Sequence, residues 1–503
     1  MTRFGRFDRY LRPPYLIAIL GIPIYFSRVE AHPLLMWDEG VYATVAQNMV
    51  REGYWLIPHL NQGLEGFVPF FQKPPLVFWL QAFAMEIIGV SVLAARLPSA
   101  VATILVAVLV FRMGELLYDW RSGVAGGMLF LVLPSVIKYG HSGSSASLDT
   151  PLVLFGSAFV WWAWRSANHD KYYVLAGLAA GLAVMTKGVA AGVFVFVLLP
   201  FLLIDSHKIY STRALQGALI SLIVISPWSV YSYIQFPNKF LQGLVFRQLS
   251  RARGDFQTYG DPLFSFMNFP YFHHVISNRI YAPFVFTVGL YLAWQSIQTD
   301  WERRGTDLRL VWWMIAPVLF FSLVGGNHGW YVLPMTVPMA VLLGRFTATI
   351  WTQLADSTGI DNLLDESLDV SYVIIGSVLV LAVGIIGYPL VEQPPPEESV
   401  VQQELGESLR MTPLSETIYS QKDIFESHNG HYVLEFYVDR AVRESTIDEM
   451  EAKPAIQYAV VSSESLSTID REYTILKEVS DSEFIIVRFE RKSARYDKIR
   501  GVT

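Results

Sequence analysis

Apolar segments of roughly membrane-spanning length recur along the first 390 residues, and short charged connectors separate them. Each segment is about as long as a helix that crosses a hydrocarbon core roughly 30 Å thick. Apolar residues make up 52% of the 503 residues and charged residues 16%, which favours a polytopic membrane protein over several soluble domains. We predict eleven spans, near residues 14–30, 98–117, 123–139, 150–165, 172–187, 189–205, 214–234, 280–298, 311–325, 331–350 and 371–390.

The composition changes after residue 391. From Glu392 to the end, acidic residues outnumber basic ones by nine, and the run Gln393–Pro396 is typical of a stiff linker. Beyond it, the stretches HYVLEFYV, AIQYAVVSS and EFIIVRFE are apolar in the manner of strands. The predicted fold class is therefore an all-α polytopic membrane bundle with external juxtamembrane helices (residues 1–390), plus a small extracytoplasmic C-terminal α/β domain (residues 391–503).

Loop charge sets the predicted orientation. Four arginines precede the first span, which places the N-terminus in the cytoplasm, and basic connectors recur on that side at alternate turns. The segment from Leu76 to Val92 is short and contains Gln81 and Glu86, so we expect it to lie on the outer surface as an amphipathic helix. Asp38, Lys73 and Asp149 then share the external face.

Three further features restrict the chain's chemistry. It has no cysteine, which excludes disulfides and thiolate metal sites. No Asn-x-Ser/Thr sequon occurs, and no cleavable signal peptide is evident at the start. No nucleotide-binding loop is apparent, and nothing indicates a nucleic-acid partner.

The first external segment carries an acid pair, Asp38-Glu39. Tyr42, Ala46 and Met49 follow at helical spacing, which predicts a short helix along the membrane. Asp38 could simply cap that helix. A carboxylate here could also take the proton from an acceptor hydroxyl as it attacks a sugar carbon.

A lysine follows in the sequence Phe71-Gln72-Lys73-Pro74-Pro75. The prolines restrict the backbone directly after Lys73, which suits a cation that must be positioned against a phosphate. The alternative is a lysine that anchors to lipid headgroups.

Other external residues are candidates for the same site. Asp149 is either a helix cap or a second active-site carboxylate, and Lys187 complements a helix C-terminus or faces the site. The external segment Gln235–Arg279 is unusually basic, so Arg247 is either a headgroup contact or a phosphate ligand. His328 and Tyr331 are either an ordinary loop histidine and an interfacial aromatic residue or hydrogen-bond donors to phosphate or sugar.

Taken in order, seven motifs resemble those of the GT-C superfamily of polyprenyl-phosphate-sugar glycosyltransferases. The likeness covers roughly residues 14–350 and is nearest to the branch of protein O-mannosyltransferases and the aminoarabinose transferase. The resemblance implies that Asp38 is catalytic, with Glu39 and Asp149 beside it, and that Lys73 and Tyr331 contact the donor phosphate. The motifs are Asp38-Glu39 with Tyr42, WLIPHLNQG, FFQKPPL, ARLPSA, SLDTPL, GLAVMTKG and WYVLP.

The chain departs from the family pattern in two places. Phe70 and Gln72 stand where relatives often have a tyrosine and a glutamate, so a hydroxyl and a possible metal-ligand carboxylate are lost. An arginine common after the acid pair is also absent, and Gly40 and Val41 stand there. No metal ligand is assigned, and a divalent cation, Mg or Mn, stays open as a cofactor.

The expected activity is an inverting transfer on the outer membrane face. The donor would be a dolichyl- or undecaprenyl-phosphate sugar, with mannose or a related hexose expected from the resemblance, and the acceptor a glycan, protein or lipid. The rival function is a lipid-linked sugar flippase. A transporter is expected to carry ionisable residues in the middle of its spans, whereas the charges here lie at span ends. A catalytically dead scaffold would not need both Asp38 and Lys73.

Overall fold

We describe the protein from a computed structural model of the chain. The described residues are 13–27, 29–61, 66–137, 143–166, 169–204, 211–247, 250, 275, 281–297, 301–324, 328–357, 376–381, 383, 395–413, 417–422, 424–425, 431–452, 457–479 and 482–490. The arginines of the N-terminus lie outside the described residues, and so does most of the predicted last span near 371–390.

The chain forms two compact units, each assembled from separate stretches of sequence. The first unit comprises Met1–Val29, Phe71–Leu80 and Arg96–Gln393, and the second comprises Glu30–Phe70, Gln81–Ala95 and Pro394–Thr503. The division passes through helices α3 (Leu76–Ile88) and α4 (Val92–Leu117). The second unit contains two stretches from the first hundred residues besides the C-terminal segment. The domain boundary predicted near residue 391 therefore stays a prediction.

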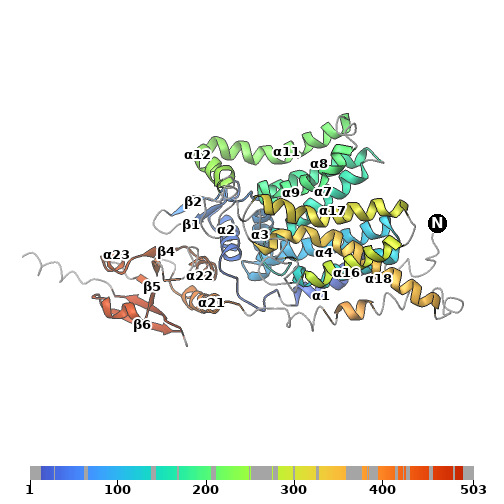
Figure 1. Ribbon diagram of the computed structural model, residues 1–503. Coiled ribbons are helices and arrows are strands. Elements are labelled where there is room, and N and C mark those ends of the chain that lie inside the picture. Colours follow the sequence, from blue (N-terminus) through green and yellow to red (C-terminus); the bar gives the residue numbers. More distant parts are fainter. Residues whose placement is uncertain are drawn as a thin grey trace, which may run out of the picture. The chain divides into compact units, whose positions relative to one another are not determined.

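The first unit is a helical bundle (Figure 1). Besides α4, its longer helices are α1 (Pro13–Phe26), α5 (Trp120–Val132), α7 (Asp149–Arg165), α8 (Lys171–Lys187), α9 (Gly192–Ile204), α11 (Thr212–Gln235), α16 (Ala282–Ile297), α17 (Trp301–Val324) and α18 (Thr336–Ser357). Its short elements are α6 (Pro134–Ile137), η3 (Gly188–Ala191), α12 (Pro237–Leu241), η4 (Gln242–Phe246) and η5 (Gly329–Met335).

Glycines allow two helix pairs of this bundle to approach closely. A Cβ on Gly177 of α8 would lie 2.0 Å from the carbonyl oxygen of Gly217 on α11. A Cβ on Gly344 of α18 would lie 2.4 Å from the backbone nitrogen of Gly126 on α5. Small residues at such crossings are typical of membrane helices, which associate through close backbone packing rather than through the hydrophobic effect.

Several helices have the length and composition of membrane spans. Among the described residues, four helical stretches are long and apolar enough to cross a bilayer: Val92–Leu117, Lys171–Pro200, Thr212–Gln235 and Gly329–Gln353. α11 leaves Leu215, Leu219 and Ile223 largely exposed, as expected for a surface that faces lipid. The bundle of apolar helices is confirmed, whereas the number of crossings and their orientation stay predictions.

Helix α3 has only 13 residues. At 1.5 Å per residue it is about 20 Å long, which is too short to cross a hydrocarbon core of about 30 Å upright. The helix is therefore compatible with the predicted interfacial position.

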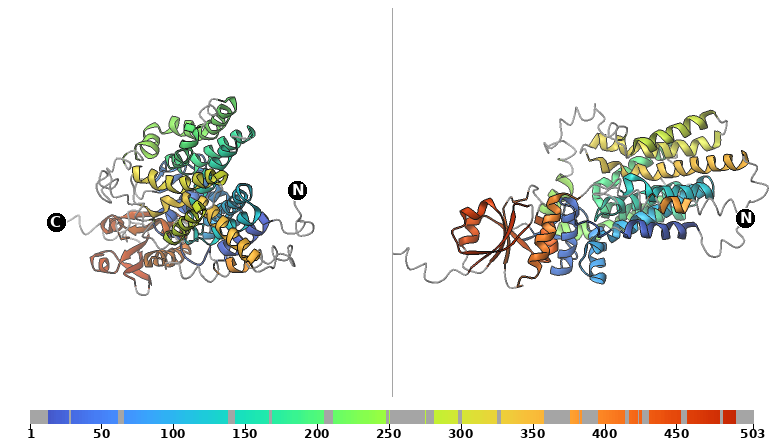
Figure 2. Two further views of the ribbon diagram at one scale, coloured as in Figure 1. Left: turned by 45° about the vertical axis from the view of Figure 1, so that its right-hand side comes forward. Right: turned by 90° about the horizontal axis from the view of Figure 1, so that it is seen from below.

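The second unit combines a helix and a hairpin from the first external segment with a C-terminal sheet domain. The N-terminal elements are α2 (Asp38–Glu52), β1 (His59–Asn61) and β2 (Phe67–Pro69). The C-terminal elements are α21 (Glu397–Arg410), β3 (Thr417–Gln421), α22 (His431–Val438), β4 (Val442–Ser445), α23 (Ile447–Ala452), β5 (Gln457–Ser462), η8 (Glu464–Thr468), β6 (Tyr473–Glu478) and β7 (Phe484–Phe489). The sheet order is β4-β3-β5-β7-β6, with β3 parallel to β4 and β5 and the other pairs antiparallel. Figure 2 shows these C-terminal strands, in red, gathered in one sheet.

The predicted C-terminal α/β domain is confirmed in outline, with one correction. AIQYAVVSS and EFIIVRFE contain strands β5 and β7, but HYVLEFYV forms helix α22 rather than a strand. Nearly every side chain of α22 is buried, since Leu434 and Val438 join the sheet-domain core while Val433 packs at Gly40 of α2. A short element buried on several sides has no polar face, so its periodicity cannot separate a helix from a strand.

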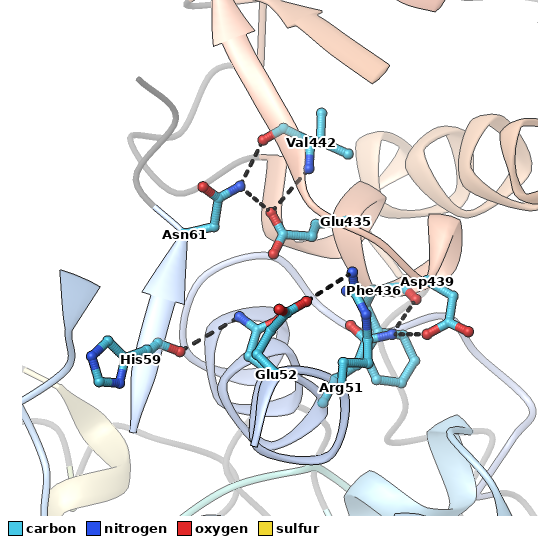
Figure 3. Close-up of polar contacts among 10 residues, drawn as sticks. Arg51, Glu52, His59, Asn61, Glu435, Phe436, Asp439 and Val442 are labelled. Carbon is cyan, nitrogen blue, oxygen red and sulfur yellow. Dashed lines mark hydrogen bonds and ion pairs between the residues drawn. The ribbon is translucent and has the colours of Figure 1, made fainter. Parts of the chain in front are cut away.

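Buried polar contacts join α22 to the N-terminal elements of this unit (Figure 3). Asn61 donates to Glu435 Oε2 and to the Val442 carbonyl, each at 2.8 Å. Gln47 donates to the Phe436 carbonyl at 3.0 Å and to the Asp439 carboxylate at 2.8 Å. Because buried polar groups are costly when unpaired, these bonds favour one arrangement of α2 and α22.

Two glutamates of this region have pKa values shifted in opposite directions. Burial raises the pKa of Glu435 above its ordinary value, although the nearby His431 and the Asn61 hydrogen bond oppose the shift. The contact with His431, whose Nδ1 lies 3.1 Å from Glu444 Oε1, lowers the pKa of Glu444.

We predict opposite pH trends for Glu435→Gln and Glu444→Gln. Because the Glu435 pKa is raised on folding, its contribution to stability is full below about pH 4.5 and declines as the pH rises toward its folded pKa. Glu435→Gln should therefore gain stability relative to wild type as the pH rises from about 4.5 to neutral. Glu444→Gln should lose stability relative to wild type as the pH rises toward about 4.5 and keep a constant deficit above it, because the lowered pKa of Glu444 makes its contribution full above the unfolded pKa and lost only as the pH falls below it.

Hydrogen exchange of the α22 amides in the full chain, measured between about pH 3 and 8 and corrected for intrinsic exchange rates, would report both trends. Parallel pH trends in the two variants would contradict this account of the network.

Candidate active site

The first candidate carboxylate lies at a strained turn. Trp37 precedes helix α2 with φ 72° and ψ −130°, a conformation that is uncommon for any residue other than glycine. Asp38 is the first residue of α2 and is partly exposed, and its carboxylate forms no hydrogen bond with the described part of the chain. Strained backbone of this kind is often kept at functional sites, where it fixes the direction of one side chain.

The neighbouring Glu39 has a different environment. It is 3% exposed, and its Oε2 accepts a hydrogen bond from the Leu35 backbone nitrogen at 2.8 Å. The Gly40 nitrogen also donates to the Leu35 carbonyl, at 2.9 Å. Glu39 thus closes the loop that leads into α2, and of the two acids only Asp38 is partly exposed. The predicted helix is confirmed, but Asp38 does not cap it, because the N-cap position belongs to Trp37.

The lysine motif is held in the first unit by aromatic and glycine contacts. The Phe71 ring packs against Trp228, Phe236 and Phe240, with centroids 5.5 to 6.3 Å apart. A Cβ on Gly243 of η4 would lie 2.8 Å from Phe71 Cβ, so only glycine allows this approach. Lys73 is thereby fixed beside the junction of α11, α12 and η4.

The loop after α8 reaches the same place. Gly188 has φ 59° and ψ −128°, which favours glycine, and a Cβ there would lie 3.7 Å from Pro74 and 3.5 Å from Leu244 of η4. Lys187 precedes this glycine, and Arg247 follows η4 directly. Three cationic residues, Lys73, Lys187 and Arg247, therefore belong to three segments that meet in the first unit.

The second candidate acid is paired with one of these cations. Asp149 is the first residue of α7 and Lys187 the last of α8, and the two side chains form a buried ion pair, 7% and 5% exposed. The N-cap position belongs to Leu148, so Asp149 does not cap the helix, and the Ser147 hydroxyl accepts a hydrogen bond from the Asp149 backbone nitrogen at 2.9 Å. The pairing of Lys187 with Asp149 was not foreseen from the sequence. The sequence did contain a signal for this pairing, because the first residue of one helix and the last residue of the following antiparallel helix lie at the same end of the helix pair.

Tyr331 extends this cluster. The Lys187 ammonium lies 5.4 Å from the centre of the Tyr331 ring, a cation–π contact. His328 stacks on Trp330 at 4.5 Å and meets Tyr331 edge-on at 5.3 Å. The small pocket beside the pair has a cavity volume of about 10 Å³, which is room for no more than about one water molecule. Asp149 and Lys187 therefore form a packed support for the aromatic residues rather than an open sugar pocket.

The surroundings of Asp149 do not fit a divalent cation. Its carboxylate is already neutralised by the Lys187 ammonium, and hard cations such as Mg²⁺ need several oxygen ligands. Among the described residues, no three His, Asp or Glu side chains are grouped so that they could hold a metal ion. We derive no catalytic step through a metal.

The cationic cluster and Asp149 lie in the first unit, and Asp38 lies in the second. The expectation that Asp38 and Lys73 act in one site stays a prediction. Among the predicted residues, the structure brings together Asp149, His328 and Tyr331, and it places Lys73 and Arg247 on segments that meet one another.

Comparisons with known proteins agree with the resemblance drawn from the motifs. A family model described as dolichyl-phosphate-mannose-protein mannosyltransferase matches residues 72–231. An undecaprenyl phosphate-α-4-amino-4-deoxy-L-arabinose arabinosyl transferase of Pseudomonas fluorescens is 25% identical over 343 residues, which is 66% of this chain and 59% of that protein. A transferase of the same name from Edwardsiella ictaluri is 26% identical over 75% of this chain and 67% of its own length. The chain thus spans about three fifths of the first of these relatives.

The fold is shared over nearly the whole chain with a solved structure. ArnT from Cupriavidus metallidurans, without ligand, superimposes with a TM-score of 0.70 over 94% of this chain and 97% of its own, at 16% identity. The same protein bound to undecaprenyl phosphate gives a TM-score of 0.67. The oligosaccharyltransferase of Archaeoglobus fulgidus gives 0.56 over 92% of this chain and 71% of its own.

The chain therefore has the GT-C fold, the fold of the polyprenyl-phosphate-sugar glycosyltransferases. Its sequence is similar to those of undecaprenyl-phosphate aminoarabinose transferases, and its fold is similar to that of ArnT.

We predict that Lys187→Met destabilises the protein far more than the double change Lys187→Met with Asp149→Leu. Removing one partner of a buried ion pair leaves an uncompensated charge and costs about 3–5 kcal/mol, whereas an apolar pair of similar size is often nearly neutral. Thermal unfolding of the purified full chain in detergent would measure both variants. Equal losses in the single and double variants would show that Asp149 is not the partner that matters.

Proposed function

We propose that this protein is an inverting glycosyltransferase that uses a polyprenyl-phosphate-linked sugar as its donor. The observation that carries the proposal is the meeting of three cation-bearing segments, with Lys73, Lys187 and Arg247, in a bundle that has the GT-C fold. A second ArnT structure with bound undecaprenyl phosphate supports a lipid phosphate as the anion.

The cations suit the leaving group of such a reaction. When the bond between the anomeric carbon and the phosphate oxygen breaks, its electron pair passes to the lipid phosphate. An ammonium and a guanidinium held in place stabilise that charge without reorganisation, since the helices have already fixed them. Lys73 and Arg247, on two segments that meet beside the Lys187–Asp149 pair, are the proposed phosphate ligands, and Tyr331 and His328 are proposed to border the donor.

The acid at the start of α2 is the proposed base. Asp38 takes the proton of the acceptor hydroxyl while the hydroxyl oxygen attacks the sugar from the face opposite to the phosphate. Lipid phosphate is a good leaving group once its charge is countered, so this scheme needs no separate general acid. Glu39 is proposed to hold the loop that presents Asp38.

The sugar and the acceptor are left at the level of class. The relatives reported above are named as aminoarabinose transferases, so they give no support to the expectation of mannose. The acceptor is a glycan, a protein or a lipid on the outer membrane face, where the sequence analysis places Asp38. The alternative, a sugar-lipid flippase, is not favoured by these relatives.

We predict that Asp38→Asn lowers kcat by about 10²- to 10⁴-fold with little change in donor KM, because it removes the proton acceptor but keeps the shape. Sugar transfer from a polyprenyl-phosphate donor, measured with the purified protein in lipid, would test this. Glu39→Gln is the matched control, since a glutamine oxygen can still accept the Leu35 hydrogen bond, and most of the activity should remain. Full activity in Asp38→Asn would remove the assignment.

We predict that Lys73→Ala and Arg247→Ala weaken donor binding by about tenfold or more each, because a charge-assisted hydrogen bond contributes about 1.5–3 kcal/mol. Titration of the full chain with polyprenyl phosphate would measure the dissociation constants. Lys239→Ala is the control, because Lys239 is exposed on the neighbouring α12. An equal effect of all three changes would indicate only general attraction between basic residues and the membrane.

A further inference from the structure

A second cavity lies at the other end of the bundle, far from the residues discussed so far. It has a volume of about 350 Å³, and its lining comes from Asp119 and the start of α5 and from residues 345–353 of α18. Cavities that bind small molecules usually measure about 300–1,000 Å³. This cavity is therefore large enough for a compact polar group.

Helix geometry separates the cavity from the candidate active site. α18 begins at Thr336, directly after the η5 helix that carries Tyr331. The lining residues Arg345 and Thr352 lie nine and sixteen residues further on, about 14 and 24 Å along the helix axis. The cavity therefore faces the opposite end of the bundle from Tyr331 and the Lys187–Asp149 pair.

The two walls of the cavity are fixed relative to each other. Gly344 of α18 packs against the backbone of Ser122 and Gly126 on α5, with contacts that leave no room for a Cβ. Arg345 Nη1 also lies 2.7 Å from Asp119 Oδ2, which joins the residue before α5 to α18. The polar groups of the cavity are thus held in place before any ligand arrives.

The lining carries an excess of positive charge. Arg121 and Arg345 contribute two guanidinium groups, and Asp119 is the one acid among the lining residues. Both oxygens of Asp119 are occupied, Oδ2 by Arg345 and Oδ1 by the Ser122 nitrogen at 2.8 Å and the Ser122 hydroxyl at 2.9 Å. Asp307 nearby accepts a hydrogen bond from Tyr118 and does not line the cavity.

One donor in this lining lacks an acceptor. Arg345 Nε is buried and has no hydrogen-bond partner in the described part of the chain. A buried donor without a partner is costly, and a guanidinium with one edge engaged by a carboxylate can still offer its Nε edge to an anion. The Gln353 amide adds a further donor to the lining.

We propose that this cavity binds a phosphate group, supplied by the headgroup of an anionic membrane lipid. Guanidinium groups match phosphate oxygens in geometry and charge. The surroundings favour a lipid as the source: Arg121 lies 5.6 Å from the ring of Trp120, an aromatic residue at a span end, and Ile350 on α18 exposes 40% of its surface. Arg112 and Arg121 belong to one of the basic connectors that loop charge predicts on the cytoplasmic side, where anionic lipid headgroups attract basic residues.

The test measures lipid retention by the full chain. The protein is placed in nanodiscs of phosphatidylcholine with increasing phosphatidylglycerol, and the tightly bound phosphatidylglycerol is quantified by native mass spectrometry after release. Arg121→Gln and Arg345→Lys should each weaken retention about tenfold or more, because each removes a guanidinium. The lysine of Arg345→Lys keeps a positive charge that can pair with Asp119, so a weaker lipid retention in this variant would not be explained by unfolding.

The control is Arg112→Gln, because Arg112 is exposed, pairs with Glu115 and does not line the cavity. Unchanged phosphatidylglycerol retention in both cavity variants, or an equal loss in Arg112→Gln, would overturn the proposal. In a second arm, inorganic phosphate is added in detergent without lipid. If inorganic phosphate stabilises the wild-type protein but neither cavity variant, the cavity is a phosphate site with a soluble source. If free phosphate has no effect and only the cavity variants lose phosphatidylglycerol, the lipid headgroup is the source.

Discussion

A buried ion pair between Lys187 and Asp149 fixes the end of the bundle on which the proposed donor site depends. Neither charge would be tolerated alone among apolar helices, so each side chain holds the other in place. The pair ties the start of α7 to the end of α8, and Lys187 in turn meets the Tyr331 ring. Gly188 then turns the chain toward Pro74, which places the Lys73 loop beside this support.

The second unit holds an acidic residue, Asp38, on the short helix α2, which does not belong to the helical bundle. α2 alone has 15 residues and few interactions that would keep it ordered by itself. The C-terminal domain supplies them, since Asn61 and Gln47 donate to Glu435, Val442, Phe436 and Asp439. The domain, which carries no motif of its own, thus acquires a structural role in presenting Asp38.

Two candidate metal ligands are accounted for by the residues present. Residue 72 is a glutamine, which offers no carboxylate, and the carboxylate of Asp149 is engaged by Lys187. The proposed mechanism therefore relies on charge neutralisation by lysine and arginine together with one carboxylate base.

The amino-acid sequence by itself determined the class of fold, because long apolar segments with charges at their ends have few stable arrangements in a bilayer. It also determined the helix that starts at Asp38 and two strands of the C-terminal sheet, whose residue patterns are strongly periodic or β-rich. Only the tertiary structure decided that HYVLEFYV is a helix, that Lys187 pairs with Asp149, that Glu39 supports its loop while Asp38 stays accessible, and that a basic cavity lies between α5 and α18. Each of these depends on which side chains meet after folding, and contacts between residues distant in the chain leave no periodic signal in the sequence.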